Sequence, residues 1–153
     1  MNEICFHRGR GYYVWAARNR SRLYMPKQEK TPIFVYGTLM SIHSNRLQRL
    51  GGYGPYLGVL YGYAMYQVAP DFPGIVPEPG GKVMGEVFYI PQQAFASLDR
   101  YEGVPDFYRR EEADVEMAGG ATVRAQVYVW NGKPEGRKIP FSEQPWRMFL
   151  IPS

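Results

Sequence analysis

Two short motifs carry the groups that could do chemistry in this chain. The first, Ile33-Phe34-Val35-Tyr36-Gly37-Thr38-Leu39-Met40, is an apolar run that stops abruptly at Gly37. The run predicts a short buried strand. Glycine lets the backbone leave that strand at a dihedral that other residues avoid, and it leaves room for a ligand. The amides from Gly37 to Leu39 could then hold a carboxylate, as backbone nests do. The alternative is an ordinary strand-to-loop turn without a ligand.

The second motif, Leu98-Asp99-Arg100-Tyr101-Glu102-Gly103, places a glutamate at the predicted end of a helix. A carboxylate there opposes the helix dipole, and burial would raise its pKa above the ordinary value of about 4.3. A glutamate shifted in this way can act as a general acid or base near neutral pH, a role that contributes roughly 10²–10⁴ in rate. If Glu102 is exposed instead, it is a solvated carboxylate at a helix end.

Two helices are predicted to position these motifs. The first covers residues 41–50, with Ser41 or Ser44 as its N-cap. The second begins at Pro91, because proline suits the first helical position, and it is closed by Gly103. The end of this second helix therefore positions Glu102.

Strand composition predicts the rest of the fold. Residues 70–81 contain four prolines and three glycines, so we expect an ordered loop there and not a central strand. Gly58 and Gly62 indicate bulges or barrel bends. The whole pattern indicates an α+β fold, a small mixed β-barrel of about six strands with two short outer helices. Strands are expected over residues 33–36, 53–68, 83–90, 108–117 and 122–130, the last two joined as a hairpin across Gly119-Gly120.

Composition limits the class of protein. The 153 residues suffice for one domain with a hydrophobic core and no disulfides. The single cysteine, Cys5, excludes a cysteine-based metal cluster, and His7 and His43 lie too far apart to suggest a zinc site. No apolar run approaches the ~20 residues that span a bilayer, and no secretory apolar segment follows the N-terminus. We therefore expect a cytoplasmic protein without a metal or a membrane partner.

Residues 1–30 differ from the rest of the chain. They carry seven of the eighteen Lys and Arg residues and two acids, a net charge of +5, whereas residues 31–153 carry eleven and twelve, a net charge of −1. The leader is a basic arm for RNA or an acidic partner, an Arg-rich targeting peptide, or a stretch preceding a natural start at Met25. We expect it to be poorly ordered, and the nearly neutral body disfavours nucleic-acid binding. Residues 31–153 are expected to form a single domain, with a tail anchored by Phe141, Trp146 and Phe149.

The two motifs, with Gly85-Glu86-Val87-Phe88 between them and Tyr108-Arg109 after them, resemble the gamma-glutamylcyclotransferase-like superfamily. The resemblance covers roughly residues 33–130 in the family's order. The nearest branch is that of the small enzymes acting on gamma-glutamylamines, including the butirosin-type cyclotransferases. The resemblance implies a small mixed barrel that releases 5-oxoproline and a free amine from a small gamma-glutamyl compound, with no cofactor.

The same resemblance assigns roles to individual residues. It implies that Glu102 is the catalytic residue and that Tyr128, an aromatic residue on a late strand, lines the pocket. The family's glutamyl-binding loop corresponds to Tyr36, Gly37, Thr38 and Leu39. The substrate's α-ammonium must lose a proton before its nitrogen attacks the γ-carbonyl, so a nearby carboxylate is the minimal catalyst. The attack is intramolecular, and effective molarities of well-aligned cases reach ~10⁵ M or more, so no nucleophilic side chain is needed.

Two functions from different classes follow. One is a cyclotransferase with Glu102 as general acid and base; the other is a non-catalytic ligand-binding or interaction module on the same fold, with Glu102 serving only structure. A glutamate at position 102 favours the cyclotransferase, because glutamine would pack equally well there if the role were only structural. Arg109 and Arg110 are interpreted as a solvated strand edge or as aids to a substrate carboxylate. Asp99 is interpreted as a cap or as a local partner of Arg100 or Arg109, and not as a catalytic residue.

Overall fold

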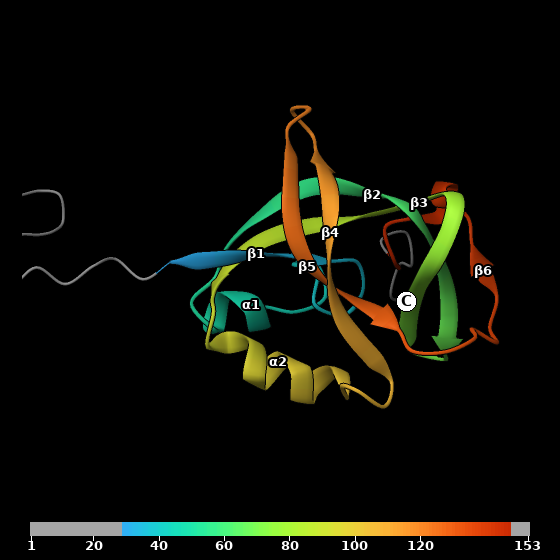
Figure 1. The fold of residues 1–153 in the computed structure, drawn as a ribbon, viewed down its shortest axis with the longest axis horizontal. Helices are drawn as coiled ribbons and strands as arrows, with labels where there is room; N and C mark the ends of the chain where they lie inside the picture. Colours follow the sequence, from blue (N-terminus) through green and yellow to red (C-terminus); the bar gives the residue numbers. More distant parts are fainter. Residues whose placement is uncertain (1–28, 148–153) are drawn as a thin grey trace, which may run out of the picture.

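A closed barrel of five strands organises the computed structural model, which describes residues 29–147 (Figure 1). Strand order in the sheet is β3-β1-β5-β4-β2-β6, and an additional pairing of β3 with β2 closes the ring and leaves β6 attached outside. The β1–β5 pairing is parallel and the others are antiparallel, so the barrel is mixed. The predicted fold class is confirmed. The strands are β1 (Lys30–Val35), β2 (Tyr53–Ala69), β3 (Phe72–Pro91), β4 (Tyr108–Met117), β5 (Thr122–Trp130) and β6 (Lys138–Ile139).

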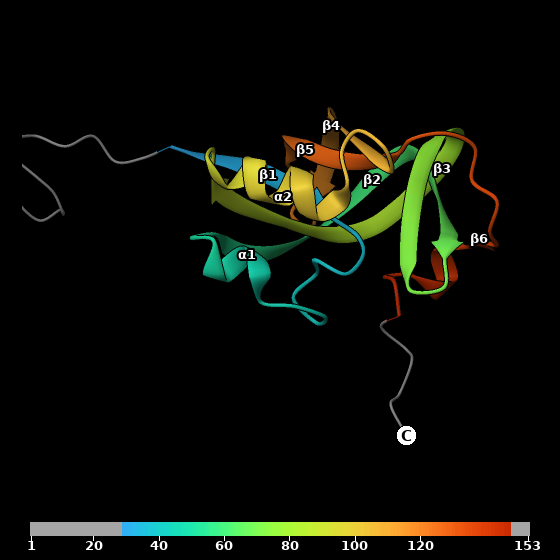
Figure 2. The ribbon, with the colours of Figure 1, turned by 90° about the horizontal axis from the view of Figure 1, so that it is seen from below.

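The long antiparallel pair of β2 and β3 forms much of the barrel wall and extends beyond it as a curved arm (Figure 2). A register shift falls between Tyr61 and Tyr63, where Gly62 has φ +87°, so the predicted bulge at Gly62 is present. Gly58 allows close packing of β2 against β4, because a Cβ there would lie 2.7 Å from Cγ1 of Val115 on β4. The predicted hairpin of β4 and β5 is confirmed, with Glu116 opposite Thr122 at its turn.

The loop predicted over residues 70–81 is wrong, because β3 begins at Phe72 and continues through its prolines. This part of β3 pairs with β2 alone, with Pro73 opposite Gln67 and Pro77 opposite Tyr63. Its pairing with β1 starts only at Glu86. An edge strand tolerates proline because one side of its backbone needs no ladder hydrogen bonds. The segment is therefore an edge strand and, as predicted, not a central one.

Helices α1 (Arg46–Arg49) and α2 (Ala94–Glu102) flank the strands, and a short 3₁₀ helix, η1 (Phe141–Glu143), follows β6. The first helix is shorter than predicted because Ser41 does not cap it: its groups bond to the carboxylate of Glu86 instead. Ser44 Oγ does accept a hydrogen bond from the Arg46 N–H at 3.0 Å. Pro91 ends β3, opposite Lys30, and so does not begin α2.

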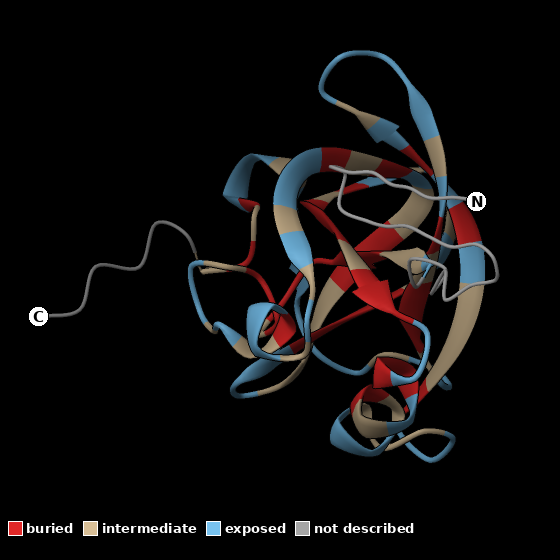
Figure 3. Ribbon diagram, turned by 90° about the vertical axis from the view of Figure 1, so that its left-hand side faces the viewer, coloured by how far each residue is buried: buried red, intermediate tan, exposed pale blue. Residues whose placement is uncertain are grey.

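The core lies inside the barrel and beneath the helices, where the buried segments of the strands face one another (Figure 3). Lys30 already belongs to β1, so the folded part starts before the predicted boundary at residue 31. Trp146 anchors the tail as predicted, since it is buried and its carbonyl contacts His43 Nε2 at 2.8 Å. The Lys82 ammonium lies over the Phe141 ring at 4.4 Å. Phe149 and residues 1–28 lie outside the described residues.

Residues 29–147 contain no helix long and apolar enough to cross a membrane. The same residues contain no group of three or more His, Cys, Asp or Glu side chains that could hold a metal ion.

Candidate active site

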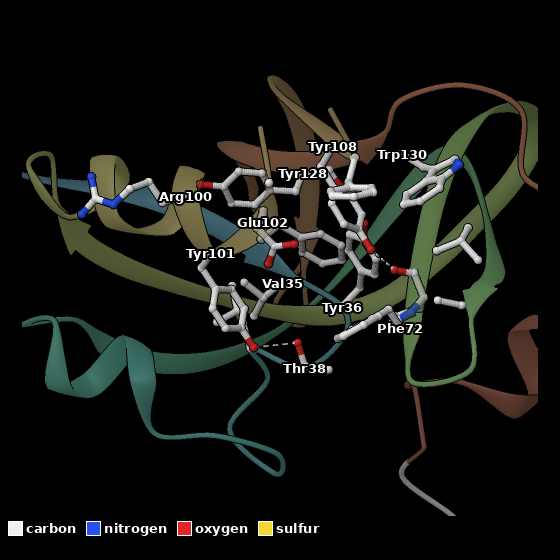
Figure 4. A pocket seen from close by; sticks show the side chains of 18 residues that line it. Val35, Tyr36, Thr38, Phe72, Arg100, Tyr101, Glu102, Tyr108, Tyr128 and Trp130 are labelled. Carbon is white, nitrogen blue, oxygen red and sulfur yellow. Dashed lines mark hydrogen bonds between the residues drawn. The ribbon is translucent and has the colours of Figure 1, made fainter. Parts of the chain in front are cut away.

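A cavity of about 640 Å³ lies between the loop after β1, the β2–β3 arm, the C-terminal end of α2 and strands β4 and β5 (Figure 4). This volume is within the range of small-molecule sites. The six residues to which the family resemblance assigned a role all line it. The lining comprises Phe34, Val35, Tyr36, Gly37, Thr38, Leu39, Val68, Ala69, Phe72, Pro73, Arg100, Tyr101, Glu102, Gly103, Phe107, Tyr108, Tyr128 and Trp130.

The loop after β1 is a tight turn whose residues line the cavity. The Met40 N–H donates to the Gly37 carbonyl at 3.0 Å. The N–H groups of Thr38 and Leu39 have no acceptor among the described residues. Successive unengaged N–H groups in a turn are suited to holding an anion.

The glycine of this loop is needed for a reason other than the one expected. Gly37 does not have a positive φ, so an unusual dihedral is not the cause. A Cβ at this position would lie 2.7 Å from Cγ of Pro73, within the arm formed by β2 and β3. Gly37 therefore permits a close contact between the loop and the opposite wall of the cavity.

Glu86 holds the other end of the loop from within β3. Its side chain is buried, and its two oxygens accept hydrogen bonds from the N–H and the hydroxyl of Ser41, both at 2.8 Å. Hydrogen bonds to a charged group stabilise more than neutral ones. This carboxylate thus fixes the loop at the point where it leaves the cavity.

We expect Glu86→Ala to lower the free energy of unfolding by about 1–3 kcal/mol, because the Ser41 N–H is left unsatisfied. The same change should raise KM for a ligand held by the loop. Glu86→Gln is the matched variant, since its amide oxygen can still accept from the N–H while the Ser41 hydroxyl accepts from its NH₂. Urea denaturation and substrate kinetics would measure both effects. Equal stability of Glu86→Ala and the wild type would contradict this role.

Helix α2 places Glu102 at the cavity because of its buried face. Phe95 and Leu98 are buried, and Glu102 lies four residues after Leu98 on the same face. The helix ends at Gly103, which has φ +69° and whose successor Val104 donates its N–H to the Asp99 carbonyl at 2.9 Å. The predicted closure of this helix by Gly103 is confirmed.

The surroundings of Glu102 favour its protonated form. Burial raises the pKa of this half-buried carboxyl to about 7, and the Arg46 guanidinium opposes the rise only in part. The two forms of the side chain are therefore both populated near neutral pH, as a general acid and base requires. Glu102 is the only carboxylate among the cavity-lining residues, all of which belong to the described part of the chain.

Three tyrosines surround Glu102 and stay neutral. Burial raises the pKa values of Tyr36, Tyr108 and Tyr128, and the charge of Glu102 raises them further. Each hydroxyl donates to a protein group. The acceptors are the Tyr128 carbonyl for Tyr36 at 2.6 Å, the Pro73 carbonyl for Tyr108 at 2.6 Å and Asp99 Oδ1 for Tyr128 at 2.7 Å. Their hydroxyl protons are therefore engaged by protein groups, and the three rings form part of the cavity wall.

The partner of Asp99 is Arg110, so the predicted pairing with Arg100 or Arg109 is wrong. Arg110 Nε and Nη2 bond to the two Asp99 oxygens at 2.9 and 3.1 Å. Arg109 bonds to Glu111 at 2.8 Å instead. Alternation along β4 explains the difference, because neighbouring side chains point to opposite faces of a strand. Neither Arg109 nor Arg110 lines the cavity. Arg110 acts on it only indirectly, because it binds Asp99, which accepts the hydrogen bond of the cavity-lining Tyr128.

Other cavity residues were not identified from the sequence. The Tyr101 ring lies beneath the Arg46 guanidinium at 4.2 Å, and its hydroxyl is 3.3 Å from Thr38 Oγ1. Arg46 carries no sequence signal of this role, because it comes from a different element of the fold. Tyr101 and Tyr108 belong to the motifs already noted, so their positions could have been found there. Phe72, Phe107 and Trp130 also line the cavity, at its other end.

The fold and the site define a class: a closed mixed barrel whose small-molecule-sized, largely aromatic cavity contains one half-buried glutamate. Comparison with known proteins is more specific. The family model "Gamma-glutamyl cyclotransferase, AIG2-like" matches residues 33–148, so the chain belongs to this family, and the predicted family is confirmed.

Individual relatives agree with this assignment. A gamma-glutamylaminecyclotransferase of Bos taurus is 31% identical over 101 residues, which cover 58% of this chain and 58% of the bovine protein. Protein AIG2 C of Arabidopsis thaliana is 29% identical over 122 residues, covering 76% of this chain and 72% of the plant protein. The chain therefore spans less than two thirds of the bovine relative.

Solved structures share the fold. An AIG2-like protein from Mus musculus superposes with a TM-score of 0.67 at 23% identity, covering 80% of this chain and 92% of the mouse chain. A protein specific to uropathogenic E. coli has a TM-score of 0.59 at 21% identity, covering 78% and 94%.

Proposed function

We propose that this protein releases 5-oxoproline and a free amine from a gamma-glutamyl compound, with Glu102 as general base and then general acid. The observation that carries the proposal is the half-buried Glu102 carboxyl, with a pKa raised to about 7, in a cavity that also contains an anion-binding type of loop. Family membership supports the same activity.

The glutamyl half is held at the loop after β1. Its α-carboxylate accepts hydrogen bonds from the unengaged N–H groups of Thr38 and Leu39, while the small Gly37 lets the loop lie close to Pro73 on the opposite wall. Tyr36 and Tyr128, both buried, shape the wall beside the glutamyl chain. Their fixed hydroxyls hold the rings in place, which favours a folded substrate conformation.

The chemistry then needs one carboxylate. Glu102 takes a proton from the α-ammonium, the freed nitrogen attacks the γ-carbonyl carbon, and a new C–N bond closes the five-membered ring. The bond between the γ-carbon and the leaving nitrogen breaks as Glu102 returns the proton to that nitrogen. The ring nitrogen loses a second proton as the lactam forms, and this proton also passes through Glu102 to the released amine. Substrate and products contain the same atoms, and the ammonium charge moves from the glutamyl nitrogen to the released amine. A pKa near the working pH suits a group that must both accept and donate this proton.

The test is product release by the wild-type protein from gamma-glutamyl methylamide, a gamma-glutamyl dipeptide and N-ε-(gamma-glutamyl)lysine. We expect equimolar 5-oxoproline and amine, measured by mass spectrometry, from at least one of them. The matched control is alpha-glutamyl methylamide, whose amide carbon cannot form the ring and which should give neither product. Binding of gamma-glutamyl compounds without any release would instead indicate a non-catalytic binding module.

A further inference from the structure

The cavity extends beyond Glu102 toward a second end that is lined by aromatic rings. In Figure 4, Phe72 and Trp130 lie on one side of Glu102, and Tyr101 lies on the other. Thr38, in the loop with the unengaged N–H groups, contacts Tyr101, since its Oγ1 lies 3.3 Å from the Tyr101 hydroxyl. A glutamyl group held there, with its α-nitrogen at Glu102, directs its amine substituent toward Phe72 and Trp130.

Aromatic rings make up this second end. The Phe107 and Trp130 rings stack with centroids 6.5 Å apart and an interplanar angle of 27°, and Tyr108 meets Trp130 edge-on at 5.2 Å. Phe72 is 49% exposed and Phe107 is 59% exposed although both line the cavity. An apolar group bound here would remove these ring faces from water, which is favourable.

Among the described residues that line the cavity, none supplies a countercharge at this end. The cavity-lining residues, which all fall in the described part of the chain, include two charged side chains, Glu102 and Arg100. The Arg100 guanidinium points away from the other side chains drawn in Figure 4. Asp71, next to Phe72, is paired with Arg147 at 3.4 Å. A charged group on the leaving amine would be partly desolvated here without a partner, which is unfavourable.

We propose that the amine half of the substrate is uncharged and apolar, with an aryl-bearing alkylamine as the preferred form. This inference rests on the proposed function, because it names the second half of the same substrate. Phe72, Phe107 and Trp130 contact the aryl group and determine specificity, while Glu102 acts on the shared gamma-glutamyl amide.

The test compares kcat/KM for gamma-glutamyl phenethylamide, gamma-glutamyl methylamide and N-ε-(gamma-glutamyl)lysine, which share the glutamyl half. We expect the phenethylamide to exceed each of the others by about tenfold or more, the discrimination that a hydrophobic pocket provides for added apolar groups. A lysine compound that is turned over as well as the phenethylamide, or better, would overturn the inference.

Variants locate the preference. Phe72→Ala and Phe107→Ala should each reduce the ratio of kcat/KM for phenethylamide over methylamide by about fivefold to tenfold. Both side chains are half exposed, so the variants should fold, and circular dichroism checks this. Tyr61→Ala is the matched control, because Tyr61 is 55% exposed and does not line the cavity. An unchanged ratio in both Phe variants would refute the assignment.

The two proposals fail in different ways. Turnover of the methylamide without an aryl preference overturns the inference and leaves the proposed function intact. If no compound is turned over, the proposed function fails, and calorimetric binding of the intact amides to the wild type decides the inference. Tighter binding of the phenethylamide than of the other two supports an aryl-binding cavity, whereas equal or absent binding overturns it.

Discussion

Glu102→Gln is expected to lower kcat/KM for 5-oxoproline release by roughly 10²–10⁴, the contribution of a positioned acid and base. Glutamine has the same shape and cannot take the proton from the α-ammonium. The three neighbouring tyrosines do not replace it, because their raised pKa values and engaged hydroxyls keep them from accepting a proton. The loss should appear mainly in kcat, since the proposed function assigns binding of the glutamyl half to the loop after β1 and not to Glu102.

The measurement is initial-rate kinetics at pH 8 for the wild type, Glu102→Gln and Glu135→Gln. Glu135 is exposed and outside the cavity, so its variant controls for removal of one negative charge. Calorimetric substrate binding to Glu102→Gln separates a lost proton transfer from lost binding. Retention of more than about a tenth of wild-type kcat/KM by a folded Glu102→Gln would remove this residue from the acid and base roles.

The second large effect is on pH dependence. We expect kcat/KM to rise with pH and to level off above an apparent pKa of about 7, because the free protein needs Glu102 ionised to accept the proton. Below that value the rate should fall about tenfold per pH unit. A pH–rate profile between pH 5 and pH 9, about the range in which the change occurs, measures this. A flat profile over this range would contradict Glu102 as the base.

The free energy of unfolding should also depend on the ionisation of Glu102, but it should fall as pH rises, whereas kcat/KM rises. The folded pKa of Glu102 is raised to about 7, so the folded protein binds a proton that the unfolded chain has already released. Below the ordinary pKa of glutamate, the carboxyl is protonated in both the folded and the unfolded state, so its burial does not lower stability. Between there and pH 7 the folded state loses stability as pH rises, by about 3 kcal/mol in total.

Glu102→Gln should therefore have a higher Tm than the wild type at pH 8, and the difference should shrink as pH falls toward 4.5. Thermal unfolding at several pH values measures it, with Glu135→Gln as control. A Glu102→Gln variant that is less stable than the wild type at pH 8 would show that the carboxylate is paired and not penalised by burial.

Local signals determined much of this protein. The Gly119-Gly120 turn set the hairpin of β4 and β5, and Gly103 set the end of α2, because turns and helix ends depend on the dihedral preferences of a few adjacent residues. Phe95, Leu98 and Glu102 are spaced so that they lie on one face of a helix. The sequence therefore also determined that Glu102 faces the same way as the two buried residues, since this periodicity is a local property. The order of the motifs identified the family.

Only the tertiary structure decided how the site is built. Ser41 and Glu86 lie 45 residues apart, and Asp99 and Tyr128 lie 29 apart, so their hydrogen bonds follow from barrel closure and leave no local pattern. The course of β3 through its prolines depends on which of its edges is paired. The raised pKa of Glu102 depends on the burial that the cavity walls create together. Residue types and turns are encoded locally, whereas desolvation and pairing arise only when distant segments are brought into contact.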